Sequence, residues 1–245
     1  MKYNFDYEVR YQDVDDTRLL RLNKLEEYLL DVAGRVANNL GFGTSYLLEQ
    51  NLTWVLTHMN IEIDTLPTHG QVLRFETWIE SNAHMLSTRD YRIYINDNDG
   101  NDDNWTLIGQ CKSVWAVLDL TKREIVNVFD QAAFEGSIDG ERLEMARAAR
   151  PMPIAEPTGV MPYKIRYSDL DYNRHCNSCQ YLEIMLDAAR LNVEGKKLRI
   201  DLSYVKEIGE GAEVEVAYLQ GENSMFYQMR DAEGKTNAFA RVTIL

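Results

Sequence analysis

A repeat within the chain limits its possible folds more than any other feature of the sequence. Residues 10–33 align without a gap on residues 166–189 and match at nine of 24 positions; the two stretches read RYQDVDDTRLLRLNKLEEYLLDVA and RYSDLDYNRHCNSCQYLEIMLDAA. Two copies are too few for a solenoid, which needs several stacked repeats to bury its core. The repeat therefore indicates that one folding unit has been duplicated.

Each copy predicts a short strand, an Asp-rich turn and then a helix. The strands are expected over residues 5–11 and 163–167. Apolar side chains then recur at helical spacing, at Leu25, Tyr28, Leu29 and Val32 in the first copy and at Tyr181, Ile184, Met185 and Ala188 in the second. Two pairs resemble helix caps with a side chain that reaches back: Asn23 with Glu26, and Asn177 with Gln180.

Alternating polarity after each helix predicts strands with one face exposed to water. The expected strands are residues 53–63, 72–80, 87–95 and 105–118 in the first copy, and 199–205, 213–219, 224–230 and 237–245 in the second. The stretch from Asn96 to Asn104 is typical of a solvated hairpin loop, because Asn, Asp and Gly dominate it. Each copy is thus one helix with four or five antiparallel strands, which is an α+β fold.

Prolines mark the boundary between the two copies. Four of the five lie between residues 151 and 162, in a stretch that can sustain neither a helix nor a central strand. We therefore expect a first unit over residues 1–139, a charged helical segment and a proline-rich linker over residues 140–162, and a second unit over residues 163–245.

The charge balance and the cysteine count exclude several classes of protein. The 245 residues include 26 Lys and Arg against 39 Asp and Glu, and the net charge of −13 argues against nucleic-acid binding. No apolar run is long enough to span a membrane, and the N-terminus lacks the pattern of a secretion signal. Three cysteines are too few for a disulfide scaffold, so we expect a cytoplasmic protein.

The densest group of polar residues follows the predicted strand of the second copy and includes Asp171, Asn173 and His175. Such residues are common in turns and helix N-caps, which is the plainest interpretation of them. A calcium loop is excluded, because Arg174 and Gln180 occupy the positions that require Gly and a bidentate Glu.

Metal and redox sites are also poorly supported. His175, Cys176 and Cys179 are zinc-type ligands, but a single C-x-x-C pair without a second pair at a finger-like spacing is weak evidence. A redox C-x-x-C motif would need a surrounding βαβ pattern, which is missing here. We expect neither a metal nor a cofactor.

A hydrolytic interpretation of the same cluster uses three of its polar side chains. Asp171, Asn173 and His175 alternate along the chain, so an extended backbone would point them the same way. A carboxylate can orient an imidazole, and an amide can donate to a developing oxyanion. The first copy has Asp15, Thr17 and Leu19 at these positions and lacks both the amide and the imidazole. The second copy is therefore the one equipped for chemistry.

The cluster also carries a family resemblance. The run from Arg166 to Asn177, followed by Tyr181, resembles the D-x-N-x-H-x-N-x-x-x-Y signature of acyl-acyl carrier protein (acyl-ACP) thioesterases. Residues 54–64, Thr77-Trp78, Arg89-Asp90 and Ser113-Val-Trp115 resemble the same family's N-terminal half. The resemblance implies a double hotdog fold and hydrolysis of acyl chains from the phosphopantetheine arm of acyl carrier protein. Members of the family with both units in one chain resemble the plant plastid enzymes, but this chain lacks a transit segment, which fits a bacterial cytoplasm.

The resemblance assigns roles to four residues. Asp171, Asn173 and His175 match the family's catalytic stretch, and Glu207, in the run Tyr204-Val-Lys-Glu-Ile-Gly209, matches its catalytic glutamate. Ile208 stands where many relatives have a cysteine. A thioester does not require a covalent step, so water is favoured as the nucleophile over Cys176. Either Glu207 or Asp171 can be the base.

Other residues are candidates for substrate binding. Trp54, Trp78 and Trp115 in the first unit can pack the core or line an apolar pocket for the acyl chain. A local basic patch would offset the repulsion between this acidic chain and acidic acyl carrier protein, and Arg174, Lys196, Lys197 and Arg199 are the candidates for it.

The resemblance leaves several properties open. The alternatives are an acyl-CoA thioesterase and a non-catalytic acyl-binding hotdog protein, because a fold alone does not fix a function. Acyl chain length, branching and a further homodimer are equally open.

Overall fold

The computed structural model describes residues 1–96, 104–146, 148 and 151–245. Apart from its two ends, the predicted loop from Asn96 to Asn104 lies outside the described residues. In the first half the elements are β1 (Tyr3–Glu8), η1 (Tyr11–Asp13), α1 (Leu22–Asn39), α2 (Thr44–Glu49), β2 (Leu52–Ile63), β3 (Val72–Ala83), β4 (Leu86–Asn96), β5 (Thr106–Asp119), β6 (Ile125–Val126) and η2 (Ala132–Phe134). In the second half they are β7 (Gly159–Lys164), η3 (Tyr167–Asp169), α3 (Ser178–Ala188), β8 (Leu198–Tyr204), β9 (Glu213–Gln220), β10 (Ser224–Asp231) and β11 (Thr236–Ile244).

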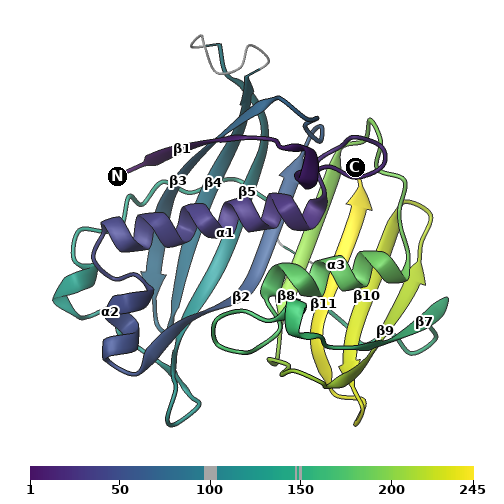
Figure 1. The fold of residues 1–245 in the computed structure, drawn as a ribbon. Coiled ribbons are helices and arrows are strands. Elements are labelled where there is room, and N and C mark those ends of the chain that lie inside the picture. The colour runs from purple at the N-terminus through teal and green to yellow at the C-terminus, as the bar shows by residue number, and fades with distance from the viewer. Residues whose placement is uncertain (97–103, 147, 149–150) are drawn as a thin grey trace.

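One antiparallel sheet runs through the whole molecule, and the helices α1 and α3 lie on the same face of it (Figure 1). The strand order is β1-β3-β4-β5-β2-β8-β11-β10-β9-β7, and β6 pairs with β5. The halves join where β2 pairs with β8, and Asn60 Nδ2 donates to Asp201 Oδ1 at 2.8 Å across this junction. The predicted α+β organisation is confirmed.

Five strands and one helix of each half repeat in the other, as the sequence predicts, whereas among the described residues α2, β6 and η2 of the first half have no counterpart in the second. Each of these five strands has its counterpart at the mirrored place in the strand order, from the central β2 and β8 out to the edges β1 and β7. Arg18 and Arg174, which correspond in the gapless alignment, share the left-handed backbone conformation at φ 66° and 65°. The duplication therefore extends to the backbone of the turn before each helix.

The long helix α1 packs an apolar stripe onto the sheet. Leu25, Leu29, Val32 and Val36 recur at helical spacing and have no exposed surface. Burying a leucine or valine side chain stabilises the fold by about 1.5–3 kcal/mol. These contacts make the helix and the sheet one core.

The two helix–sheet spaces are filled differently. On α1, small residues at Ala33, Gly34 and Ala37 border a cavity, and a Cβ added at Gly34 would meet no atom within 4 Å. Beneath α3, large side chains fill the corresponding space, among them Met185, Met225, Tyr227 and Met229. The first half therefore has the open interior.

Three sequence predictions about local structure are wrong. The described residues of the expected helix, 140–146 and 148, are not helical. Trp78 Nε1 donates to Glu141 O and Leu143 N donates to Asp90 Oδ2, so this segment bonds to the sheet instead of to itself. Strand β7 begins at Gly159, inside the expected linker, and tolerates Pro162 because it is an edge strand.

The third wrong prediction concerns the helix caps. Helix α1 begins at Leu22, so Asn23 lies within the helix and is no cap. In the second half Asn177 is the predicted N-cap and accepts from Cys179 N, whereas the Gln180 side chain donates to Glu183 instead.

Among the described residues, no helix has both the length and the apolar character that crossing a membrane requires.

Candidate active site

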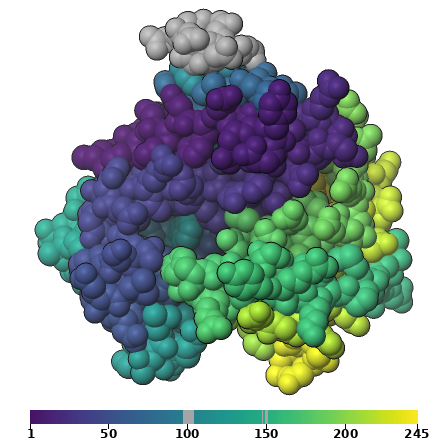
Figure 2. All heavy atoms as spheres, in the orientation of Figure 1, coloured from purple at the N-terminus to yellow at the C-terminus, as the bar shows by residue number. Residues whose placement is uncertain are grey.

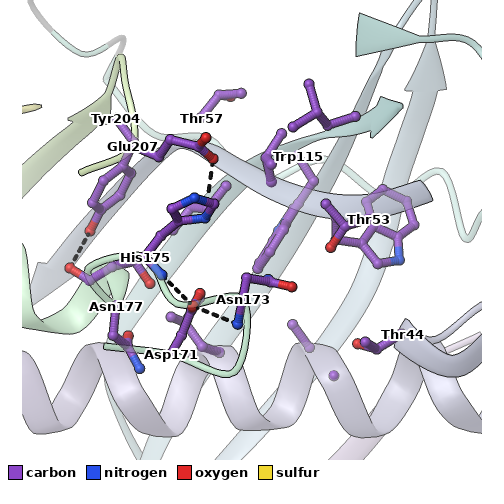
Figure 3. A pocket seen from close by; sticks show the side chains of 18 of the residues that line it. Thr44, Thr53, Thr57, Trp115, Asp171, Asn173, His175, Asn177, Tyr204 and Glu207 are labelled. Carbon is purple, nitrogen blue, oxygen red and sulfur yellow. Dashed lines mark hydrogen bonds and ion pairs between the residues drawn. The ribbon is translucent and has the colours of Figure 1, made fainter. Parts of the chain in front are cut away.

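A tight loop between η3 and α3 holds the predicted catalytic cluster (Figure 3). Asp171 Oδ1 accepts from Asn173 N at 2.8 Å and from His175 N at 3.1 Å. Asp171 N donates in turn to His175 O at 2.8 Å, and Arg174 takes the left-handed conformation that closes the turn. The backbone is thus not extended as predicted. Asp171 therefore orients His175 by accepting from the backbone N–H of that residue, and not by contacting its imidazole ring.

The imidazole of His175 faces the predicted fourth residue, Glu207. His175 Nδ1 lies 3.3 Å from Glu207 Oε2, and both side chains are about one-third exposed, at 33% and 38%. The loop that carries Glu207 follows β8 and is fixed on two sides. Cys176 N donates to Ile208 O at 2.7 Å, and Lys206 N donates to Asn237 O at 3.0 Å.

The second oxygen of Glu207 is held from the other half of the chain. Arg123 Nη2, in the turn after β5, forms an ion pair with Glu207 Oε1. Two hydrogen bonds close this turn, in which Asp119 Oδ1 accepts from the backbone N–H groups of Thr121 and Lys122. His175, Glu207 and Arg123 therefore form one row of contacts across the boundary between the halves.

The equivalent loop of the first half has the same backbone and none of this chemistry. Asp15 Oδ1 accepts from Thr17 N at 2.8 Å, as Asp171 does from Asn173 N. Leu19 stands in place of His175. Leu20 N donates to Pro67 O as Cys176 N donates to Ile208 O, which places Leu66 where the second half has Glu207.

A cavity of about 1060 Å³ connects the two halves. Asp171, Asn173, His175 and Glu207 line one end of it, and α1, β2, β4 and β5 of the first half supply much of the rest. Figure 2 shows its opening as a hollow between α1, α2 and the catalytic loop. An apolar cavity with a few polar groups at one end is typical of a site for a small or chain-like ligand.

The predicted binding residues divide into two groups. Trp54 and Trp115 line the cavity, and their indole N–H groups donate to Phe42 O and Ser113 Oγ. Trp78 and Arg174 are not among the lining residues. Trp78 is fully buried beneath Lys2 and Arg92, and Arg174 is exposed on the outside of the catalytic loop.

Cys176 is unsuited to be a nucleophile. It is 5% exposed, and burial raises the pKa of its thiol to about 12, so the thiolate is scarce at neutral pH. Ile208, at the position of the family's cysteine, is buried and contributes only its backbone carbonyl to the loop.

The predicted basic patch is wrong for Arg199. This residue is only 8% exposed, and its guanidinium pairs with Glu62 and Asp201. Lys196 and Lys197 follow the C-terminal end of α3, whereas the catalytic loop precedes its N-terminal end. Lys197 also pairs with Asp64. Basic side chains at the catalytic end are instead Arg174, Lys122 and Arg123.

Sequence reasoning missed Arg123. It has no counterpart in the repeat, and only the tertiary pairing of β5 with β2 brings its turn to Glu207. The one available signal is the pair Lys122-Arg123 in a turn directly after a predicted strand. Within the described residues, no group of three or more His, Cys, Asp and Glu side chains is arranged to hold a metal.

Comparison with known families supports what the motif implies. The family model of the acyl-ACP thioesterase N-terminal domain matches residues 1–134, and that of the acyl-ACP thioesterase C-terminal domain matches residues 155–243. The chain belongs to the acyl-ACP thioesterase family. The two matches correspond to the two halves of the sheet, and residues 135–154 lie outside both matches.

Curated members of the family are similar over most of this chain. A chloroplastic palmitoyl-acyl carrier protein thioesterase of Arabidopsis thaliana is 26% identical over 202 residues, which is 77% of this chain and 47% of that protein. A chloroplastic oleoyl-acyl carrier protein thioesterase of the same plant is 25% identical over 206 residues, or 77% of this chain and 55% of that protein. The chain spans about half the length of the curated relatives it matches.

Solved structures of acyl-ACP thioesterases have the same fold. A thioesterase from Bacteroides thetaiotaomicron superposes with a TM-score of 0.85 at 26% identity, covering 100% of this chain and 98% of that chain. The 12:0-ACP thioesterase of Umbellularia californica gives 0.81 at 17% identity, covering 99% and 96%. The likeness to the Umbellularia californica enzyme concerns the fold alone. Both superpositions extend over the whole sheet.

Proposed function

We propose that this chain hydrolyses the thioester of fatty acyl-acyl carrier protein and releases a free fatty acid. One observation carries the proposal: the paired side chains of His175 and Glu207 lie at the end of an apolar cavity that runs into the first half. The family supports the substrate class. The intact set Asp171, Asn173, His175 and Glu207 argues against a non-catalytic acyl-binding protein, which has no use for it.

In the first step a water attacks the thioester carbonyl carbon. In this mechanism His175 Nδ1, which lies 3.3 Å from Glu207 Oε2, directs its proton to that carboxylate, so that Nε2 takes a proton from the water. The contact supports the His175–Glu207 pair as the base, and the hydrogen bonds from the backbone N–H groups of Asn173 and His175 to Asp171 support a role for that carboxylate in holding the loop. A carbon–oxygen bond forms, and the carbonyl electron pair moves onto its oxygen.

In the second step the intermediate collapses. The carbonyl re-forms, the carbon–sulfur bond breaks, and His175 returns its proton to the leaving thiolate. Asn173 lines the cavity near His175, and in this mechanism its amide N–H₂ donates to the oxyanion. No covalent acyl-enzyme is needed, because a thioester is already activated.

The same proposal covers the architecture and the partner. The two helix–sheet halves are two hotdog units, the first for the acyl chain and the second for the chemistry. The thioester carrier is acyl carrier protein, and coenzyme A is the second candidate. The cytoplasmic location and the homodimer stay predictions from the sequence.

The test is thiol release from purified acyl-acyl carrier proteins with saturated chains of eight to eighteen carbons. We expect turnover that a His175→Ala variant loses almost completely, and weaker turnover of the matched acyl-CoA. Binding without turnover would make the chain a carrier or sensor. A preference for acyl-CoA would replace acyl carrier protein in the proposal.

A further inference from the structure

A buried acid of the first half lies one hydrogen bond away from the cavity. Glu26, on α1, has no exposed surface, and its Oε1 lies 2.5 Å from Tyr204 Oη of β8. Its other oxygen, Oε2, is buried and has no hydrogen-bond partner among the described residues. Tyr204 lines the cavity at the catalytic end, although the mechanism proposed above uses neither residue.

The surroundings of Glu26 favour its neutral form. On α1 the adjacent Glu27 adds a like charge, and Lys24 pairs with Glu27. Within the described part of the chain, no Lys, Arg or His forms an ion pair with Glu26, and burial raises the pKa of its carboxyl group to about 7. Burial also raises the pKa of each titratable side chain that faces it from another element, so these stay uncharged near neutral pH: Cys111 of β5, Cys179 of α3 and Tyr204 of β8.

The Tyr204 hydroxyl has a second acceptor within reach. Tyr204 lies beside the catalytic loop (Figure 3), and its Oη is 3.3 Å from Ser178 O in the first turn of α3. Ser178 comes three residues after His175, and Tyr204 comes three residues before Glu207. A hydrogen bond from Tyr204 to Ser178 therefore joins the two segments that carry the proposed catalytic pair.

The single hydrogen of this hydroxyl cannot serve both acceptors well. When Glu26 is ionised, its carboxylate takes the hydrogen, because a hydrogen bond to a charged acceptor is the stronger one. Ser178 O then faces a lone pair of Tyr204 Oη. When Glu26 is neutral, its own O–H donates to Tyr204 Oη, and the phenol hydrogen can donate to Ser178 O.

We propose that Glu26 is a proton-controlled positioning residue for the catalytic end. As a neutral acid it donates to Tyr204, which in turn donates to Ser178. This row of hydrogen bonds holds together the segments that carry His175 and Glu207. Ionisation of Glu26 reverses the first bond and breaks the second, so activity falls as the pH rises through neutrality. The inference rests on the proposed function and adds a regulation of the same site.

The test is the pH dependence of kcat in two variants of α1, measured with the best substrate of the acyl-acyl carrier protein panel. In Glu26→Gln the amide N–H₂ donates to Tyr204 at every pH, because the reverse orientation would bury that group without an acceptor. We expect kcat of Glu26→Gln to equal the wild-type value at about pH 5.5 and to exceed it about tenfold at about pH 8.5, the value of one hydrogen bond.

The ratio of the two kcat values cancels every ionisation that both proteins share, that of His175 included. The change in this ratio should be centred at about pH 7. Glu27→Gln, one position further along α1, is the matched control and should keep the wild-type profile. A ratio for Glu26→Gln that stays constant with pH overturns the inference.

Two tyrosine variants show whether the coupling runs through Tyr204. In a Tyr204→Phe background, exchanging Glu26 for Gln should no longer change the pH dependence of kcat. Tyr227→Phe removes a similar bond, from a buried tyrosine to Ala189 O beyond the other end of α3, and should leave the effect of Glu26→Gln intact. An effect of full size in the Tyr204→Phe background overturns the inference. Intrinsic fluorescence at each pH verifies that every variant is folded.

The carbonyl carbon of Ser178 reports the second hydrogen bond without turnover. Its carbon-13 NMR signal should shift on a transition at about pH 7 in the wild type and stay constant in Glu26→Gln, and a signal that moves alike in both overturns the inference. If acyl-acyl carrier proteins are cleaved with the same pH dependence by both proteins, the proposed function stands and the inference fails. If none is cleaved while Ser178 still follows Glu26, the row of hydrogen bonds stands and the proposed function fails.

Discussion

Arg123 of the first half and Glu207 of the second form an ion pair, and the other oxygen of Glu207 faces His175. The proposed catalytic pair is therefore in contact with a turn that belongs to the opposite half of the chain. A carboxylate fixed at both oxygens cannot rotate away from the imidazole that it orients.

Removing this hold should slow the reaction without weakening substrate binding. We expect Arg123→Leu to lower kcat by about ten- to a hundredfold, since small displacements of a catalytic group cost that much, and to leave KM near the wild-type value. Arg123→Lys should recover part of the rate, and Lys122→Gln in the same turn should do nothing to kcat. An unchanged kcat with a raised KM would instead show that Arg123 takes part in binding the acyl carrier protein.

Exchanging the two carboxylates for amides should separate their roles. Glu207→Gln removes the acceptor beside His175 and should lower kcat by about two orders of magnitude or more, within the range of general-base effects. Asp171→Asn retains an oxygen for the N–H groups of Asn173 and His175, so it should cost much less. Steady-state kinetics on one acyl-ACP substrate compares the kcat values of the two variants. Near-normal turnover of the Glu207→Gln variant would show that Glu207 is not part of the general base.

Filling the cavity at Gly34 should shorten the accepted acyl chain. Gly34 lies inside α1 with no atom within 4 Å of an added Cβ, so leucine there fits the helix and occupies cavity space. We expect Gly34→Leu to lower kcat/KM for sixteen- and eighteen-carbon chains far more than for eight-carbon chains. Equal losses at every length would place the acyl chain elsewhere.

A buried glutamate should make stability fall as pH rises. Glu26 on α1 is fully buried, accepts from Tyr204 Oη at 2.5 Å, and has its pKa raised by burial to about 7. The folded state then holds a proton that the unfolded state releases near pH 4.5, so stability is lost between these two values. Glu26→Gln should remove this loss and be more stable at pH 8 by about 3 kcal/mol. Urea unfolding at pH 5 and pH 8 measures it, and identical pH dependence in both proteins would contradict it.

Charge reversal near the catalytic end should weaken recognition of the acidic carrier. Lys122 is 69% exposed, and Arg174 lies on the outside of the catalytic loop. We expect Lys122→Glu with Arg174→Glu to raise KM for acyl-acyl carrier protein several-fold at low salt, and less at high salt. Lys196→Glu with Lys197→Glu, beyond the far end of α3, is the matched control. A larger effect from that control would restore the patch expected from the sequence.

Most of the fold could be predicted because duplication and alternation are local signals. Leu25, Leu29 and Val32 pack as their spacing predicts, and the strand bounds agree within a few residues. The helix expected after Gly140 failed for a tertiary reason. The hydrogen bonds from Trp78 and Leu143 fix that segment in an extended form, which helix propensity alone cannot reveal.

The site could be predicted in its residues but not in its geometry. The motif and the family resemblance supplied Asp171, Asn173, His175 and Glu207, which all line one cavity. The backbone role of Asp171 depends on the left-handed turn at Arg174, and a turn of that kind is unusual for a residue with a side chain. Arg123 contacts Glu207, which lies 84 residues further along the chain, and the sequence offers no periodic signal for a contact of that kind.

The difference between the two equivalent loops has a consequence for how such a protein can change. The half with His175 and Glu207 has a filled interior, and the half with Leu19 and Leu66 at those positions has the open one. If the proposed function holds, substitutions under α1 alter which acyl chain is accepted while the proposed reacting groups keep their surroundings. In a symmetric pair of identical units every such substitution would occur twice and alter both. Under the proposed function, duplication within one chain therefore lets selectivity and chemistry change independently.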